Sequence, residues 1–169
     1  MSALTNSTNT VLAKPDTEIT NFKILLIEDS ELDTLLINKA LSKYSPNARL
    51  ISANCFCEGE KVLESENIDL ILLDLGLPDT ASPHSTYEKI KKWAAKIPVI
   101  VLTNLEAPEL ARMMIRDGLP EFLHKDMIIK SPHRLQEIID FSIERHSLRK
   151  SSEQKDSILR CFMGEYSVN

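Results

Sequence analysis

The residues in this chain with the most chemical potential are three acids, one hydroxyl and one amine, far apart in the sequence: Glu28, Asp29, Asp74, Thr103 and Lys125. Carboxylates that crowd together repel one another unless protons or a cation neutralise them. Oxygen ligands suit Mg²⁺, which commonly takes one or two carboxylates together with phosphate oxygens. A lysine ammonium and a threonine hydroxyl can bind phosphoryl oxygens, and a carboxylate can itself become an aspartyl-phosphate. Asp74 is the candidate nucleophile.

Each of these residues follows a short apolar segment. Glu28-Asp29 follow the first segment, Asp74 the third, Thr103 the fourth and Lys125 the fifth; the segments are 22–27, 49–53, 68–73, 98–102 and 121–124. Nearly continuous apolar runs of this length are typical of strands covered on both faces, as in parallel sheets.

Helical patterns alternate with the strands. The first follows an N-cap at Asp29-Ser30 and runs to about Tyr44; the others cover 58–66, 87–95, 107–117 with Gly118 as C-cap, and a final helix from near Pro132 to about Ser151. This alternation predicts an α/β fold, a flavodoxin-like (βα)5 doubly wound parallel sheet with strand order 2-1-3-4-5. Ligands of such sheets bind at the carboxyl ends of the strands, where the five candidate residues stand.

The length of 169 residues allows one domain with tails. Residues 1–20 are rich in Ser, Thr and Asn and are predicted to be a disordered leader. We expect the domain at 21–148 and a C-terminal helical extension or tail at 149–169, with an apolar cluster at 158–163. No separate output domain fits in that remaining length.

Composition narrows the function further. A net charge of −5 disfavours nucleic-acid binding, and the basic residues between His146 and Lys155 are interspersed with acids, which is typical of a solvated helix face. Three cysteines do not form a disulfide framework and fit a reducing compartment. No signal peptide or transmembrane segment is apparent, so we expect a cytoplasmic protein without membrane contact.

Four motifs carry a resemblance to a known family. ILLIEDS, LILLDLGLPD, VIVLTN and DGLPEFLHKD occur in this order, each on the expected element. Over roughly residues 22–146 the chain resembles the receiver domain of bacterial two-component response regulators, in its CheY-like, stand-alone form. Each motif is weak alone, but the ordered set is specific.

The resemblance implies a role for each matching residue. Asp74 would accept phosphate from a histidine kinase or a phosphotransfer protein in a phosphorelay. Asp29 would bind Mg²⁺ directly and Glu28 through water, with Asp74 and the backbone carbonyl of Gly76 completing the ligands. The remaining positions would bind and report the phosphoryl group: Thr103 and Lys125 would hold its oxygens, and Phe122 would be the switch aromatic.

The resemblance also implies the output. Phosphorylation would remodel the face formed by the helix at 107–117, the strand at 121–124 and the final helix, which would bind a downstream target protein. The C-terminal helix could also support a homodimer. Such a protein is not an enzyme beyond slow autophosphatase activity, and Gly76 and Leu105 lack the polar groups that would accelerate it.

Two positions depart from the family pattern. Asp126 stands where the family usually has Pro, so we expect a differently shaped loop after Lys125. Asn104 replaces a smaller residue after the switch hydroxyl and would narrow access to the phosphate.

Other functions compete with this interpretation. The main alternative is a receiver-like interaction module that works without phosphorylation. A haloacid-dehalogenase-type phosphatase needs Asp-x-Asp after the first strand, and Asp29-Ser30-Glu31 lacks the second Asp. A flavodoxin needs a Ser/Thr/Gly-rich phosphate loop there, which the acidic pair opposes.

Overall fold

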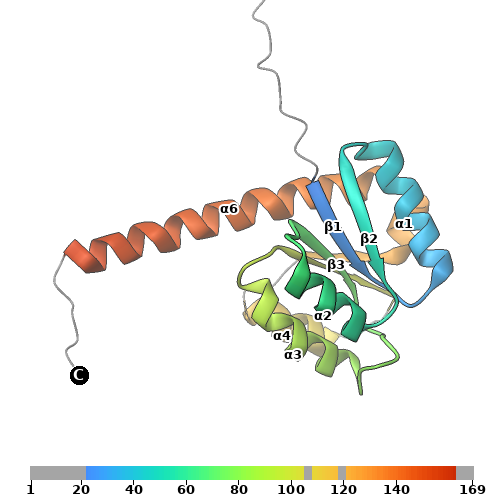
Figure 1. The fold of residues 1–169 in the computed structure, drawn as a ribbon, viewed down its shortest axis with the longest axis horizontal. Helices are drawn as coiled ribbons and strands as arrows, with labels where there is room; N and C mark the ends of the chain where they lie inside the picture. The colour runs from blue at the N-terminus through green and yellow to red at the C-terminus, as the bar shows by residue number, and fades with distance from the viewer. Residues whose placement is uncertain (1–21, 105–107, 118–120, 163–169) are drawn as a thin grey trace, which may run out of the picture.

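A computed structural model describes residues 22–104, 108–117 and 121–162, and its centre is one parallel sheet (Figure 1). The sheet contains five strands in the order β2-β1-β3-β4-β5, which confirms the predicted topology. The strands are β1 (Phe22–Ile27), β2 (Ala48–Ala53), β3 (Leu70–Asp74), β4 (Val99–Thr103) and β5 (Glu121–His124).

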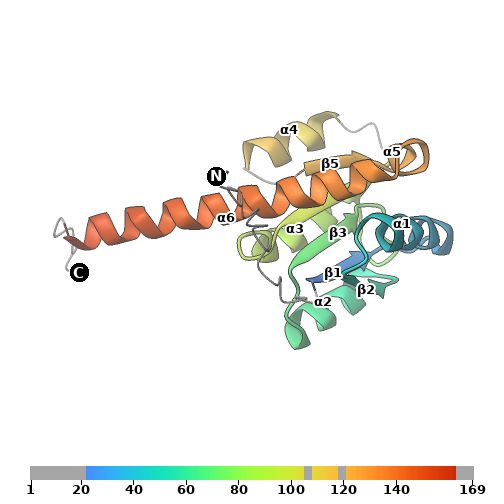
Figure 2. The same cartoon turned by 90° about the horizontal axis from the view of Figure 1, so that it is seen from above.

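Helices cover both faces of the sheet (Figures 1 and 2). One face carries α1 (Glu31–Tyr44), α5 (Lys125–Lys130) and α6 (His133–Phe162). The other carries α2 (Phe56–Ser65), α3 (Pro83–Ala94) and α4 (Pro108–Arg116). The doubly wound arrangement is therefore as predicted, with one more helix than expected.

The apolar strands supply two cores because successive side chains point to opposite faces. Leu25 and Ile27 of β1 face α2, α3 and α4, whereas Ile24 and Leu26 face α1, α5 and α6. All four side chains are fully buried. This two-sided burial explains why the strands are continuous apolar runs.

Two helices begin earlier than predicted, and a capping box explains one of these boundaries. The hydroxyl of Ser82 accepts a hydrogen bond from the Ser85 N–H in a reciprocal capping box, with Pro83 in the first turn, so α3 begins before the predicted Tyr87. α2 begins at Phe56 rather than Glu58, and Cys55 at its N-cap makes no side-chain cap hydrogen bond.

The predicted loop after Lys125 was wrong, because the chain enters α5 directly at Lys125. With Asp126 in place of Pro, the backbone N–H of residue 126 is available, and the His124 ring accepts a hydrogen bond from it at 3.4 Å. An acid in the first turn and Lys130 in the last suit the helix dipole, and Ile128 is buried.

The final helix is longer than predicted and extends away from the domain body (Figure 1). Its basic residues are not simply solvated, because three of them contact carbonyls at the end of α3. The His146 ring lies 3.0 Å from the Lys96 carbonyl oxygen, which Lys150 also reaches at 2.9 Å; Arg149 donates to the Ala94 carbonyl at 3.2 Å. These contacts satisfy carbonyls that a helix C-terminus leaves unpaired.

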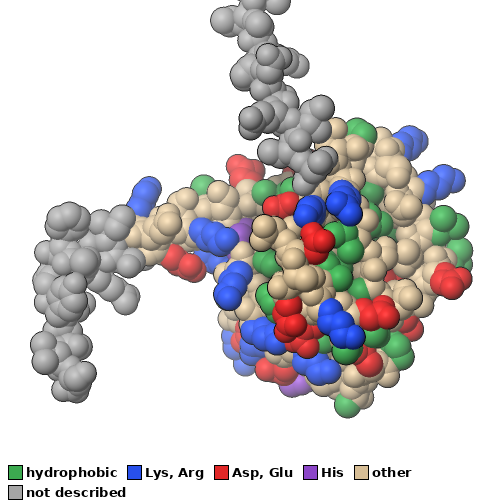
Figure 3. All heavy atoms as spheres, in the orientation of Figure 1, with side chains coloured by type: hydrophobic (Ala, Val, Ile, Leu, Met, Phe, Trp, Pro, Cys, Tyr) green, Lys and Arg blue, Asp and Glu red, His purple; other side chains and the backbone are tan. Residues whose placement is uncertain are grey.

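Charges of both signs are interspersed on the face that carries α2 and α3 (Figure 3). Lys92 of α3 pairs with Glu60 of α2, and Lys91 lies 3.1 Å from Asp117. Ion pairs therefore link neighbouring helices across this surface.

Some predictions fall outside the described residues: the leader at 1–20, Leu105, the Gly118 C-cap and the side chains of the cluster at 158–163. The predicted domain boundary at 148 lies within the continuous helix α6 and stays a prediction. Within the described part of the chain, no helix has the length and apolarity needed to cross a membrane.

Candidate functional site

The strand register brings the candidate residues to one edge of the sheet. Ile27 pairs with Leu73, so Glu28 and Asp74 follow at the same level. Asp74 pairs with Leu102, which places Thr103 next along β4, and Thr103 pairs with His124, which precedes Lys125. The parallel pairing therefore gathers residues that are separated widely in sequence.

The Lys125 ammonium is the centre of the site. Its Nζ lies 2.7 Å from Oε2 of Glu28, 2.9 Å from Oδ2 of Asp74 and 2.8 Å from Oδ2 of Asp33. Lys125 and Glu28 are both buried, with exposed fractions of 7% and 1%. A buried lysine is tolerable only when its charge is paired, and here three carboxylates surround it.

Burial and pairing shift the pKa values of this cluster. Burial by itself would lower the pKa of Lys125, but the hydrogen bonds to Asp33, Glu28 and Asp74 outweigh it and raise that pKa. Burial raises the pKa of Glu28 above its ordinary value, although the Lys125 hydrogen bond opposes the shift. The negative charge of Asp74 raises it further, so Glu28 gains from any additional cation nearby.

Three of the acids can hold a metal ion. Glu28, Asp29 and Asp74 each offer a carboxylate oxygen, and these oxygens lie within 4.8 Å of one another. All the donors are hard oxygens, and Asp29 is exposed, so the set fits Mg²⁺ with water retained in its shell. Asp33 is not part of this group, although it shares Lys125 with two of its members.

Asp74 is partly accessible, with 14% of its side chain exposed. Its Oδ1 accepts a hydrogen bond from the Gly76 N–H at 3.2 Å. A Cβ on residue 76 would lie 3.8 Å from Oδ2 of Asp74, so any larger side chain there would adjoin the carboxylate. Glycine at this position leaves the surroundings of Asp74 uncrowded.

The remaining predicted residues lie on β4, on β5 and just after β4. Thr103 is half-buried at the end of β4, and Asn104 after it is exposed. Phe122 of β5 is half-buried and packs against the core cluster beneath α2, α3 and α4. The structure thus pairs Lys125 with Glu28 and Asp74 and places Asp29 beside these two acids. The switch roles of Thr103 and Phe122 stay predictions.

Sequence reasoning missed Asp33, the third partner of Lys125. It occupies the first turn of α1, where an acid is usually explained by the helix dipole. The available signal was its position one turn after the acidic pair, on a helix whose N-terminus begins at the strand edge.

A comparison with family models matches residues 24–140 to the response regulator receiver domain. This match spans most of the chain, and the fold and acidic edge agree with it. The chain therefore belongs to the response regulator receiver family. None of the curated proteins matches it.

Solved structures show the same fold. A CheY-like receiver domain protein from Methanospirillum hungatei JF-1 is 21% identical, with a TM-score of 0.64 over 76% of this chain and 98% of that one. A receiver domain protein from Clostridium thermocellum is 25% identical, with a TM-score of 0.64 over 75% and 98%. NtrX from Brucella abortus, solved with ATP, is 20% identical with a TM-score of 0.66 over 79% of this chain but 29% of its own.

Proposed function

We propose that this receiver domain is a Mg²⁺-dependent phosphoacceptor, in which Asp74 takes a phosphoryl group from a histidine kinase or a phosphotransfer protein. The observation that supports the proposal best is the Lys125 ammonium 2.9 Å from Asp74, beside the three-carboxylate group. A nucleophilic carboxylate, a fixed cation and a metal-ligand set are the parts that phosphoryl transfer to aspartate requires.

Each residue has a defined task in this reaction. An Asp74 carboxylate oxygen forms a bond to phosphorus while the P–N bond of the phosphohistidine breaks, and the departing imidazole nitrogen keeps that electron pair and takes a proton. Lys125 stabilises the negative charge on the phosphoryl oxygens, and Thr103 donates a hydrogen bond to one of them. Glu28, Asp29, Asp74 and the Gly76 carbonyl would hold Mg²⁺, which neutralises charge on the incoming group when bound.

The proposed output surface comprises α4, β5 and α6. In this proposal, movement of Thr103 and Phe122 alters the surface and so changes binding of a downstream target protein. Large apolar side chains are exposed on both helices: Ile115 on α4 at 65%, and Phe141 and Leu148 on α6 at 57% and 65%. The same side of α6 could bind a second copy of the chain as a homodimer. The cytoplasmic location stays a prediction.

Intact mass spectrometry tests the phosphoacceptor role. The full chain is incubated with acetyl phosphate and Mg²⁺, alongside Asp74→Asn and, as a matched control, Asp140→Asn on the exposed face of α6. We expect one phosphoryl adduct on the wild type and on Asp140→Asn, none on Asp74→Asn, and none when EDTA removes the metal.

Absence of an adduct on the folded wild type, with acetyl phosphate and with a phosphorylated histidine phosphotransfer domain as donors, would contradict the proposal. It would favour the alternative, a receiver-like module that binds partners without phosphorylation. Asn104 and Asp126 would then be the first residues to revert toward the family pattern.

A further inference from the structure

The Lys125 ammonium donates hydrogen bonds to Asp33 and Asp74 and forms an ion pair with Glu28, whose Oε2 lies 2.7 Å away. Two of its partners, Glu28 and Asp74, also belong to the group whose oxygens can hold a metal ion. Asp33 does not, and so it is the partner of Lys125 that the metal does not need.

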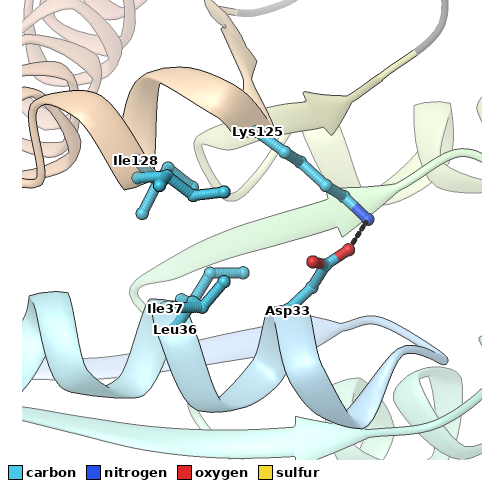
Figure 4. A pocket seen from close by; sticks show the side chains of 6 residues that line it. Asp33, Leu36, Ile37, Lys125 and Ile128 are labelled. Atoms are coloured by element: carbon cyan, nitrogen blue, oxygen red, sulfur yellow. Dashed lines mark hydrogen bonds and ion pairs between the residues drawn. The ribbon is translucent and has the colours of Figure 1, made fainter.

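The Asp33–Lys125 pair joins α1 to α5 (Figure 4). It lies beside a small pocket whose other walls are apolar: Leu36, Ile37, Ile128 and Ile129. The side chains of Lys125 and Asp33 are 9% and 24% exposed. Limited solvent and apolar neighbours strengthen an ion pair relative to one on an open surface.

Glu28 and Asp74 are subject to a competition. Each can direct its oxygens to the ammonium or to a metal ion, and each interaction weakens the other. If Lys125 had no third partner, its charge would depend more heavily on the two metal ligands. Asp33 relieves that dependence, because it accepts a hydrogen bond from the same ammonium.

We propose that Asp33 is a positioning residue that acts through Lys125. It holds the ammonium at the α1–α5 side of the pocket, so that Glu28 and Asp74 are free to bind Mg²⁺ while Lys125 stays within reach of Asp74. This inference rests on the proposed Mg²⁺-dependent function and deepens it.

Isothermal titration calorimetry of the full chain with MgCl₂ tests the role directly. The variants are Asp33→Asn, Asp33→Glu, and Glu31→Gln, which removes a charge from an exposed position in the same first turn of α1. Asp33→Asn and Glu31→Gln are each repeated in a Lys125→Met background to form double-mutant cycles.

We expect Asp33→Asn to weaken Mg²⁺ binding by about three- to tenfold, in the lower part of the range for residues in direct contact. Glu31→Gln should change the Kd by less than about twofold, because exposed charges interact weakly. Asp33→Glu should recover part of the affinity. In the Lys125→Met background, Asp33→Asn should shift the Kd by less than about twofold, since the partner is gone.

An unchanged Kd in Asp33→Asn would overturn the inference, and so would an equal loss in the Lys125→Met background, which would show a simple field effect. If Asp33→Asn fails to fold, Asp33→Glu takes its place in the double-mutant cycle with Lys125→Met. The same comparison of Mg²⁺ Kd values then decides the question. Wild type that binds no Mg²⁺ also overturns it. A Lys125-dependent effect of Asp33→Asn on the Mg²⁺ Kd, in a chain that forms no phosphoryl adduct, would support the inference and refute the proposed function.

Discussion

The carboxylate of Asp79 accepts a 2.9 Å hydrogen bond from the backbone N–H of Phe56, the first residue of α2. Its other oxygen accepts from the N–H of Cys57 at 2.8 Å. The loop that follows Asp74 therefore caps a helix from the preceding βα unit, in place of the missing side-chain cap at Cys55. Asp79 couples the position of that loop to the start of α2.

Asp79→Ala should destabilise the fold by about 1 kcal/mol at pH 7, the usual cost of losing an N-cap. The stability of Asp79→Asn should fall between those of Asp79→Ala and the wild type. The asparagine side chain has one oxygen, so it can replace one of the two carboxylate oxygens that accept hydrogen bonds. Urea unfolding followed by circular dichroism measures both, with the exposed Glu144→Ala as control. A wild-type midpoint for Asp79→Ala would show that α2 does not need this cap.

The Asp79 contribution should also depend on pH. Burial would raise its pKa, but the hydrogen bonds from Phe56 and Cys57 prevail and hold the pKa below the ordinary 3.8. A carboxylate with a lowered pKa stabilises the fold above its unfolded pKa and loses that effect as pH falls through the folded value. The stability gap between wild type and Asp79→Ala should therefore be constant near neutrality and narrow only below about pH 3.8.

The sheet and most of the site were predictable because strand ends are local signals. An apolar run that stops at Asp74 or at Lys125 marks both the strand and the residue at its carboxyl end. The parallel topology then brings these ends together without any information on side-chain contacts.

The parts that escaped prediction depend on contacts between distant segments. Asp79 caps a helix that begins 23 residues earlier, and Asp33 reaches Lys125 across 92 residues. The local sequence makes Asp79 look like an ordinary turn residue, and for Asp33 it offers only the position one turn after the acidic pair. α5 escaped prediction for another reason. Asp126 in place of Pro indicates a changed loop, but the sequence alone does not show that the N–H of residue 126 allows a helix to begin at Lys125.

Gly59 of α2 packs directly against Ile27 of β1. A Cβ added there would lie 2.5 Å from Cδ1 of Ile27 and 2.8 Å from Cγ1, and Ile27 is fully buried. Gly59→Ala should destabilise the fold by about 1–3 kcal/mol through overpacking, reduced by the roughly 1 kcal/mol gained in helix propensity.

The Ile27→Val substitution tests that mechanism because it removes Cδ1. Alone it should cost about 0.5–1.5 kcal/mol. Combined with Gly59→Ala it should cost less than the sum of the two single changes, which urea unfolding of the four proteins would reveal. Strict additivity would show that the glycine is not required by contact with Ile27.

Lys125→Met should lower the free energy of unfolding, because the carboxylates of the pocket would repel one another without the ammonium. Glu28, Asp33 and Asp74 would lose their shared cation, at a cost on the order of 2–3 kcal/mol. This is below the roughly 3–5 kcal/mol for a fully buried charge, because Asp33 and Asp74 retain solvent. Thermal melts with Mg²⁺ and with EDTA should show a larger metal-induced rise in Tm for this variant than for the wild type.

Lys130→Met is the matched control for that experiment, since its exposed ammonium lies 3.9 Å from Asp126, outside the pocket. It should leave the Tm and the Mg²⁺ response close to those of the wild type. Equal Mg²⁺ responses in Lys125→Met and wild type would contradict the idea that ammonium and metal compete for the same carboxylates.

His146 should make the stability of α6 packing depend on pH. Its Nε2 lies 3.0 Å from the Lys96 carbonyl oxygen, so the neutral ring donates a hydrogen bond from this nitrogen. Burial lowers its pKa below the ordinary 6.5, and the nearby positive charges of Lys150 and Arg149 lower it further. The Lys96 carbonyl and Glu153 oppose this shift without reversing it.

A histidine with a lowered pKa binds protons more readily in the unfolded chain, so folding stability rises with pH between the folded pKa and 6.5. His146→Gln keeps an N–H donor for the carbonyl but removes the titration. We expect wild type to lose more stability than His146→Gln when the pH falls from about 7.5 to 5, measured by urea unfolding at each pH. His84→Gln, which alters an exposed histidine on α3, should follow the wild-type curve. Parallel curves for wild type and His146→Gln would instead mean that protonation costs nothing at this contact, and that the Lys96 carbonyl accepts a hydrogen bond from the imidazolium as readily as from the neutral ring.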